Sequence, residues 1–369
     1  MAFCRNLRYI YNISKLLYNY GVFMSKVLKV AISGLGRIAW WYHLPMLEKD
    51  ERFELVAVSD PVEERLKEFS ETHPAVHTYT DYNAMLDSEA TLDMVVIASP
   101  TMFHLPQAVA ALEHKLAVFL EKPMCESLES AEKLAAAVER TNGKLMLYQP
   151  HRSHLETMVL KNQVLSKLGS INHVRRTLAI FNRRNDWQSR KDCGGGMLNN
   201  YGAHYIDQFM HVFGFDLTID GCLMRRTVGI GDAEDLVSVL MTNKAGISCN
   251  LEINLGSAET INTWEVFGSL GCARWDNTQA CWRITYVEPG TLTELSMQDS
   301  LAALGRSYSQ EGNIPWIREE IALDSETQIN FYDKIYDYFA NDLAPFVPLA
   351  ESMQLMKALA DCRKASERN

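Results

Sequence analysis

Short apolar runs alternate with helix-length amphipathic segments through the first part of the chain, between residues 28 and 148. The apolar runs are rich in Val, Ile, Leu and Phe and fall at residues 27–32, 53–59, 94–98, 117–120 and 144–148. The amphipathic segments between them fall at residues 37–49, 62–71, 105–114 and 128–140. Continuous apolar strands alternating with helices are typical of a parallel sheet that is covered on both faces. The pattern predicts an α/β class protein whose N-terminal domain is a doubly wound parallel sheet of the Rossmann type.

The pattern changes after about residue 150. Longer runs at residues 171–181, 236–241, 247–255 and 263–267 predict strands, and several of them alternate apolar with polar positions. Two helix-length segments follow at residues 328–343 and 349–366, separated by prolines. We therefore expect two domains, the first over residues 24–149 and the second over residues 150–369.

The first 23 residues differ from the rest, because they hold three basic residues, six aromatic residues and no acid. Asn12 and Lys15 interrupt the apolar stretch that a secretory signal would need. Met24 then opens a segment that runs directly into the first strand. We expect residues 1–23 to be an upstream extension or a loosely held arm, with a contact in an oligomer as the alternative.

Charge and composition narrow the classes of partner. The chain carries 36 Lys and Arg against 46 Asp and Glu, a formal net charge of -10, which disfavours nucleic acids and anionic membranes as partners. No run of 18 apolar residues predicts a membrane span. The eight cysteines contain no CxxC pair, which argues against zinc ribbons and favours reduced thiols in the cytoplasm. A small-molecule partner is the expectation that remains.

A GxGxxA turn follows the first predicted strand and opens the first predicted helix. Gly34 would permit the tight turn, and Gly36 would let backbone N–H groups approach a pyrophosphate. Asp60 ends the second strand, where its carboxylate would bind the adenosine ribose and repel a 2′-phosphate. The turn therefore predicts an NAD site, with NADP still possible because Arg37 and Arg65 could offset the charge of Asp60.

Further motifs lie where later strands end. The turn 99–104 follows the fourth apolar run, Glu121-Lys122-Pro123 follows the fifth, and a triple glycine at 194–196 precedes the segment Gly-Ala-His-Tyr-Ile-Asp at 202–207. With these motifs the chain resembles the Gfo/Idh/MocA family of oxidoreductases, which includes glucose-fructose oxidoreductase and inositol dehydrogenase. The resemblance extends from Met24 nearly to the end of the chain.

The resemblance implies a second α/β domain that begins near Pro150 and has a large, open, mainly antiparallel sheet. Family members often cover such a sheet with another subunit, so it also implies a homodimer or homotetramer. It implies that the cofactor lies against residues of the glycine turn and of the strand ends. With Gly34, Gly36 and Asp60, these predicted contacts are Arg37, Ile38, Ser99, Pro100, His104, Glu121 and Lys122.

Lys122 and His204 are the predicted proton-transfer residues. Oxidising a secondary alcohol needs a proton acceptor and a group that stabilises charge on the oxygen beside the nicotinamide. The ammonium of Lys122, in a partly dry pocket, should have a lowered pKa that suits it to this work. His204 can exchange a proton near neutral pH and precedes Asp207 by one helical turn. Pro123 resembles the family's proline, often cis, which would aim the lysine.

One position departs from the family pattern. Many dehydrogenases of the family have an aspartate four residues before the histidine, and this chain has Asn200 there. An amide cannot titrate, although it can bind a hydroxyl or orient His204. We therefore expect Asn200 to act in the catalytic site by positioning substrate, while Lys122 and His204 divide the acid–base work.

The remaining substrate contacts are predicted less directly. The resemblance places a substrate-facing arginine after the sixth strand, which is Arg152, and Asp207 and Asn200 are further predicted contacts. Trp187 could stack on a sugar ring, or it could instead pack a domain interface. No clustering of His, Cys and carboxylates supports a metal site.

Three functions remain open from the sequence. The first is an NAD(P)-dependent oxidoreductase that interconverts a hydroxyl and a keto group on a sugar, polyol or related cyclic alcohol. The second is a redox-neutral, NAD-dependent glycosidase or epimerase that uses a transient keto intermediate. The third is a dinucleotide sensor without catalysis.

Overall fold

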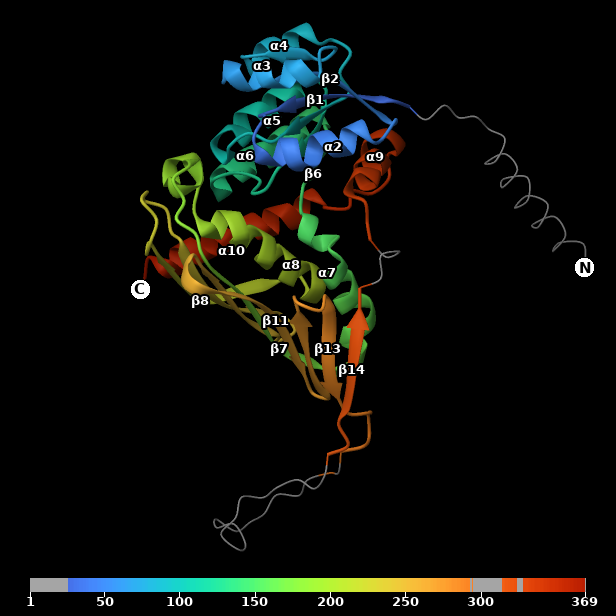
Figure 1. Cartoon of the computed structure of the whole chain (residues 1–369), viewed down its shortest axis with the longest axis vertical. Coiled ribbons are helices and arrows are strands. Elements are labelled where there is room, and N and C mark those ends of the chain that lie inside the picture. Colours follow the sequence, from blue (N-terminus) through green and yellow to red (C-terminus); the bar gives the residue numbers. More distant parts are fainter. Residues whose placement is uncertain (1–25, 293, 295–313, 324–327, 369) are drawn as a thin grey trace, which may run out of the picture.

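The computed structural model of the chain describes residues 26–292, 294, 314–323 and 328–368, arranged around two β-sheets (Figure 1). The extension predicted for residues 1–23 lies outside the described residues. Within the described ranges, no helix is both long and apolar enough to cross a membrane.

The first sheet is parallel throughout and has the strand order β3-β2-β1-β4-β5-β6. Its strands are β1 (Leu28–Ser33), β2 (Phe53–Ser59), β3 (His77–Tyr79), β4 (Met94–Ile97), β5 (Ala117–Leu120) and β6 (Leu145–Leu147). Its helices are a π-helical turn (Ala39–His43), α2 (Leu44–Glu48), α3 (Glu63–Thr72), α4 (Tyr82–Ser88), α5 (His104–Glu113) and α6 (Leu128–Thr141). The strand order reverses beside β1, and crevices of this kind hold ligands in doubly wound sheets. The predicted Rossmann-type sheet is confirmed.

The second sheet is mixed and mostly antiparallel, with the order β14-β13-β12-β11-β7-β10-β9-β8. Only β7 and β10 pair in parallel among its described strands. The strands are β7 (Ile171–Phe181), β8 (Leu217–Arg225), β9 (Leu236–Asn243), β10 (Ser248–Asn254), β11 (Gly256–Gly268), β12 (Gly271–Asp276), β13 (Cys281–Tyr286) and β14 (Ile317–Ala322). The predicted large, mainly antiparallel sheet is therefore confirmed.

Helices cover one face of the second sheet (Figure 1). They include α7 (Leu155–Val159), α8 (Ala203–Phe213) and α10 (Leu349–Ser366). Along β9, Val237, Val239 and Met241 are fully buried, whereas Leu240 is 47% exposed. This alternation places Leu240 on the face of the sheet that the helices leave open.

Helix α9 (Phe331–Asn341) returns to the first sheet (Figure 1). The rings of Tyr332 and Tyr336 pack edge-on against Phe53 of β2, with centroids 5.4 and 5.9 Å away. The hydroxyl of Tyr336 also donates a hydrogen bond of 3.0 Å to the carbonyl of Lys26. Part of the segment that we assigned to the second domain, residues 150–369, thus completes the packing of the first.

Candidate active site

The glycine turn lies between the ends of β1 and β4. Gly34 has a φ of +92°, and a Cβ there would lie 2.8 Å from the backbone nitrogen of Ser99, so only glycine fits. At Gly36, by contrast, an added Cβ would meet nothing within 4 Å. The space in front of Gly36 is where a pyrophosphate would approach the backbone, so the turn fits a dinucleotide.

Asp60 supports this turn directly. Its carboxylate, 2% exposed as a residue, accepts hydrogen bonds from the backbone N–H of Leu35 at 2.8 Å and of Val62 at 2.9 Å. Arg65 lies 3.2 Å from the same carboxylate and has a half-exposed side chain. Asp60 and Arg65, the two residues expected to affect the preference for NAD or NADP, therefore lie in contact.

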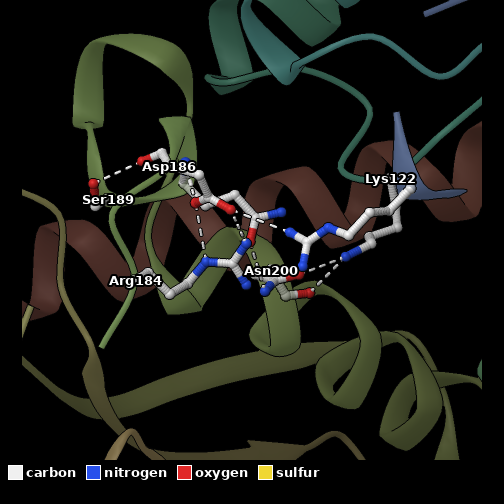
Figure 2. Close-up of polar contacts among 7 residues, drawn as sticks. Lys122, Arg184, Asp186, Ser189 and Asn200 are labelled. Atoms are coloured by element: carbon white, nitrogen blue, oxygen red, sulfur yellow. Dashed lines mark hydrogen bonds and ion pairs between the residues drawn. The ribbon is translucent and has the colours of Figure 1, made fainter. Parts of the chain in front are cut away.

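Arg37 leaves the turn and reaches the second domain. Its guanidinium lies 3.1 Å from the carboxylate of Asp186, which Arg184 also binds (Figure 2). Although burial raises the pKa of Asp186, the bond from Arg184 holds that pKa below its usual value. Asp186 also caps the turn Trp187–Ser189 by accepting from the N–H of Gln188 at 3.1 Å. The segment before the triple glycine is thereby bound to the glycine turn. Ile38, next to Arg37, is 37% exposed.

The turn after β4 is partly exposed at Ser99 and Pro100, as a cofactor contact requires. His104 has a different position. It is 1% exposed, and its ring nitrogens lie 2.9 Å from the carbonyl of Pro123 and 3.0 Å from that of Ser99. Because both nitrogens face backbone carbonyls, His104 braces two strand-end turns, which differs from the predicted contact with the cofactor.

Both carboxylate oxygens of Glu121 have partners within the protein. One of its carboxylate oxygens lies 3.1 Å from Nε2 of the buried His43, whose Nδ1 lies 2.9 Å from the hydroxyl of Tyr332 in α9. The other accepts the N–H of Lys122 at 3.2 Å. The peptide bond between Lys122 and Pro123 is cis, as the resemblance implied. The carboxylate of Glu121 thus links His43 to the backbone of Lys122, and its predicted contact with the cofactor stays a prediction.

Lys122 extends toward the second domain and meets Asn200 (Figure 2). Its Nζ donates to Oδ1 of Asn200 at 2.8 Å and to the carbonyl of Asn200 at 3.2 Å. Burial lowers the pKa of Lys122 to about 8; Glu121 opposes this shift and the charge of Arg184 adds to it. The pKa of Lys122 is therefore lowered, as expected, and the side chain of Lys122 is bound by the neutral amide of Asn200.

The triple glycine closes this site against the first domain. Gly194 has a φ of +74°, and a Cβ there would lie 2.9 Å from Cβ of Thr101. The amide of Asn200 donates to the side chain of Gln188 at 3.0 Å. A small pocket results, in which Trp187 takes part; its lining residues are Thr101, Lys122, Pro123, Trp187, Gln188, Gly194, Gly195, Gly196, Asn199 and Asn200.

His204 lies in the first turn of α8, four residues after Asn200, and is buried. Its ring centroid is 4.2 Å from that of His151, a close neighbour that the sequence did not single out as a site residue. Burial lowers the pKa of His204 well below its usual value, and the nearby charge of Lys122 lowers it further. His204 is therefore neutral near neutral pH, and its Nδ1 has no hydrogen-bond partner in the part of the chain that the structure describes.

Arg152 and Asp207 bind each other. Two nitrogens of Arg152 donate to the two carboxylate oxygens of Asp207 at 2.8 and 2.6 Å, and a third donates to Glu351 in α10. Arg152 is 1% exposed and Asp207 is fully buried. The prediction that these two residues contact substrate does not agree with this arrangement, because their polar atoms are used in an internal ion pair.

No group of three or more His, Cys, Asp or Glu side chains among the described residues is arranged to hold a metal ion. The side chains that complete the site without an evident sequence motif are His43, His151, Arg184 and Gln188. Arg184 and Gln188 share the segment before the triple glycine, whereas His43 and His151 come from two other parts of the chain, so the fold is what brings these side chains to the site.

Gly36→Val tests the cofactor turn. We expect the variant to fold, since the added side chain has free space, but to exclude the pyrophosphate. NAD at about 100 times the wild-type Kd should stabilise the wild type by about 2.7 kcal/mol and the variant by much less. Thermal melting with and without NAD measures both values. Equal stabilisation of the two proteins would contradict the assignment of this turn.

Comparison with known proteins places the site in a family. Residues 28–149 match the GFO/IDH/MocA oxidoreductase family, NAD-binding Rossmann fold, and residues 165–274 match the GFO/IDH/MocA C-terminal domain. The chain is 31% identical over 198 residues to D-glucoside 3-dehydrogenase of Escherichia coli, a match that covers 52% of this chain and 55% of that relative. It spans 52 to 62% of the length of the first curated relatives it matches.

Solved structures share the fold over nearly the whole chain. An NAD-binding protein from Listeria innocua superposes with a TM-score of 0.79 at 22% identity, covering 93% of this chain and 96% of that one. The WlbA dehydrogenase from Bordetella pertussis, in complex with NADH and UDP-GlcNAcA, superposes with a TM-score of 0.73 at 17% identity, covering 92% and 97%. With both family domains matched and a Rossmann turn that fits a dinucleotide, this chain belongs to the GFO/IDH/MocA family of NAD-binding oxidoreductases.

Proposed function

We propose that the protein is an NAD(P)-dependent oxidoreductase that interconverts a secondary hydroxyl and a keto group on a sugar, polyol or related cyclic alcohol. The observation that carries the proposal is the pairing of Lys122 Nζ with Asn200 Oδ1 at 2.8 Å, in the small pocket that the triple glycine lines. The relative named D-glucoside 3-dehydrogenase and the neighbour crystallised with NADH and a sugar nucleotide support a carbohydrate substrate.

Lys122 supplies the acid–base chemistry in this proposal. Bound NAD serves as the hydride acceptor for alcohol oxidation. With a pKa of about 8, Lys122 is in part neutral near neutral pH and takes the proton of the substrate hydroxyl. The ammonium so formed is held by the amide of Asn200 and returns the proton in the reverse direction. His204, which is neutral, donates its ring N–H to the oxygen of the same hydroxyl and so keeps the hydroxyl proton directed at Lys122.

Asn200→Asp is expected to move the pH profile to higher pH. A carboxylate in the place of the amide would lie about 3 Å from the ammonium of Lys122 and favour its charged form. The pKa of Lys122 should then rise by about one unit or more, and each unit lowers the neutral fraction about tenfold below the pKa. The rate of alcohol oxidation near neutral pH falls accordingly and recovers at higher pH.

The measurement is kcat/KM for oxidation against pH in the wild type and the variant, with Asn254→Asp as a control on a distant strand. The expected result is a rising limb near the pKa of about 8 in the wild type and a displaced limb in Asn200→Asp only. Identical profiles for the two enzymes would mean that Lys122 is not the proton acceptor.

A substrate panel separates net oxidation from redox-neutral chemistry. Binding of NAD and of NADP is first compared by thermal shift. The protein and the preferred cofactor are then incubated with sugars and polyols. The proposal predicts one NADH or NADPH for each molecule of ketone product. Product that forms without any accumulation of reduced cofactor would favour the glycosidase or epimerase alternative.

We also propose that a second copy of the chain covers the open face of the large sheet. Leu240 on β9 is 47% exposed in the single chain, and Ile261 on β11 is 42% exposed. Another subunit packed on this face would cover both apolar side chains. Light scattering should then give a multiple of the 41.9 kDa chain mass. A mass of one chain would contradict this part of the proposal.

A further inference from the structure

A partly buried arginine lies beyond the histidines of the site, on the face of the large sheet that α8 covers. Arg176 is on β7, and its guanidinium carbon lies 4.0 Å from the ring centroid of Tyr205 in α8. The ring of Tyr205 in turn meets His151 edge-on, with centroids 5.5 Å apart. Arg176, Tyr205 and His151 thus form a continuous set of contacts that leads to His204.

Within the described ranges of the chain, Arg176 forms no ion pair with a carboxylate. Its Nη1 donates to Oδ1 of Asn262 at 2.6 Å and to the carbonyls of Thr263 and Thr177 at 3.0 and 3.2 Å, all uncharged acceptors. Its Nε is buried and has no partner among the described residues. Glu156, whose charge acts on Arg176 from farther away, is bonded instead to His154 at 3.2 Å. Burial lowers the pKa of Arg176, as expected for an unpaired cation.

The neighbouring histidines also have unused polar atoms. His151 and His204 stack with their centroids 4.2 Å apart, and the Nδ1 atom of each is buried without a hydrogen-bond partner within the described residues. The charge of Lys122 acts on both rings, whereas that of Arg176 acts on His151. His151 therefore lies between the proton-transfer end of the site and the arginine.

Unpartnered buried polar atoms are rare in folded proteins, and a group of them beside an active site indicates a missing ligand. Here the group has three such nitrogen atoms, contributed by Arg176, His151 and His204, and it includes a cation that forms no ion pair with an acid among the residues that the structure describes. A ligand that satisfies it must bring oxygen acceptors and a negative charge. Arginine recognises carboxylates and phosphates in this way through its parallel N–H groups.

We propose that Arg176, assisted by His151, binds an oxyanion substituent, a carboxylate or a phosphate, on the sugar whose hydroxyl reacts at Lys122. This inference rests on the proposed function and narrows its substrate class to acidic sugars. The reacting hydroxyl lies at Lys122 and His204, and the oxyanion lies on the far side of His151. A neutral sugar would leave the guanidinium uncompensated, so the site discriminates against it.

Binding to the NADH-loaded protein tests the proposal without turnover. The probes are glucuronate, galacturonate, gluconate and glucose 6-phosphate, each compared with glucose, galactose or glucitol, and the affinity is read from thermal shifts and calorimetry. We expect at least one anionic probe to bind about 10 times more tightly than its neutral counterpart. The carboxylate and phosphate arms show which oxyanion the site takes. A panel in which no anionic probe binds more tightly than its counterpart overturns the proposal.

Two variants locate the effect. Arg176→Gln should remove the preference for the anionic probe, with an affinity loss of about 10-fold or more, and leave neutral sugars unchanged. Arg176→Lys, which keeps the charge, should retain part of the preference. Arg175→Gln, on the neighbouring exposed position of β7, is the control and should change nothing. Equal losses for anionic and neutral sugars in Arg176→Gln would show a structural role and overturn the proposal.

The outcomes separate this proposal from the proposed function. Oxidation of neutral and acidic sugars with equal efficiency overturns the anion site and leaves the oxidoreductase function intact. Arg176-dependent binding of an acidic sugar without any reduction of NAD retains the anion site and contradicts the proposed reaction.

Discussion

Replacing Lys122 with methionine is expected to lower turnover by at least about 100-fold while NAD binding stays near that of the wild type. General acid–base groups contribute about 10²–10⁴-fold in rate, and methionine keeps the length of the side chain without its proton. The lysine is bound to the neutral Asn200 at 2.8 Å, so its loss leaves no buried charge unpaired. The protein should therefore fold and bind cofactor normally.

Steady-state kinetics and NAD thermal shifts on the same preparation measure the two effects. Lys133→Met is the matched control, because Lys133 is a solvent-exposed lysine on α6 whose ion pair with Glu129 lies at the surface. The control should keep the wild-type rate. A turnover of Lys122→Met within a few-fold of the wild type would remove Lys122 from the mechanism.

Replacing Arg152 with methionine is expected to destabilise the protein by about 3–5 kcal/mol, because it leaves the fully buried Asp207 without its partner. Arg152 holds Asp207 of α8 and Glu351 of α10 together, so the loss should affect the packing of both helices. Urea titration of the variant against the wild type measures the change.

Arg175→Met serves as the control, since that arginine is exposed on β7 and its distance from Glu265 is 3.8 Å. It should cost less than about 1 kcal/mol. If Arg152→Met instead kept the wild-type stability and raised KM for the sugar, Arg152 would be the substrate contact that the family resemblance implied.

The first sheet was predictable because most of its strands are largely buried and apolar. Residues 53–59 and 117–120 form β2 and β5 with the predicted bounds. β3, His77–Tyr79, was missed because it is an edge strand with two exposed positions and no apolar run. In the second sheet, β14 was missed for a similar reason, since half of the residues in its sequence Ile-Arg-Glu-Glu-Ile-Ala are charged.

The site was predictable where it depends on motifs and less so where it depends on distant contacts. The glycine turn, Lys122 and Asn200 were found because each stands at a strand end or in a family motif. The ion pair between Arg152 and Asp207, which are 55 residues apart, depends on how the helices pack, and no local sequence pattern predicts it. The same holds for the bond between Glu121 and His43, which are 78 residues apart.

A deuterium label on the carbon that bears the reacting hydroxyl shows whether the protein transfers a hydride to the cofactor. A sugar oxidised by the enzyme is labelled there, and the cofactor and the product are analysed by mass spectrometry. We expect one deuterium in each molecule of reduced cofactor and one molecule of ketone for each reduced cofactor. In Lys122→Met, neither the labelled cofactor nor the ketone should accumulate. Label that remains in the product while the cofactor stays oxidised and unlabelled would contradict it.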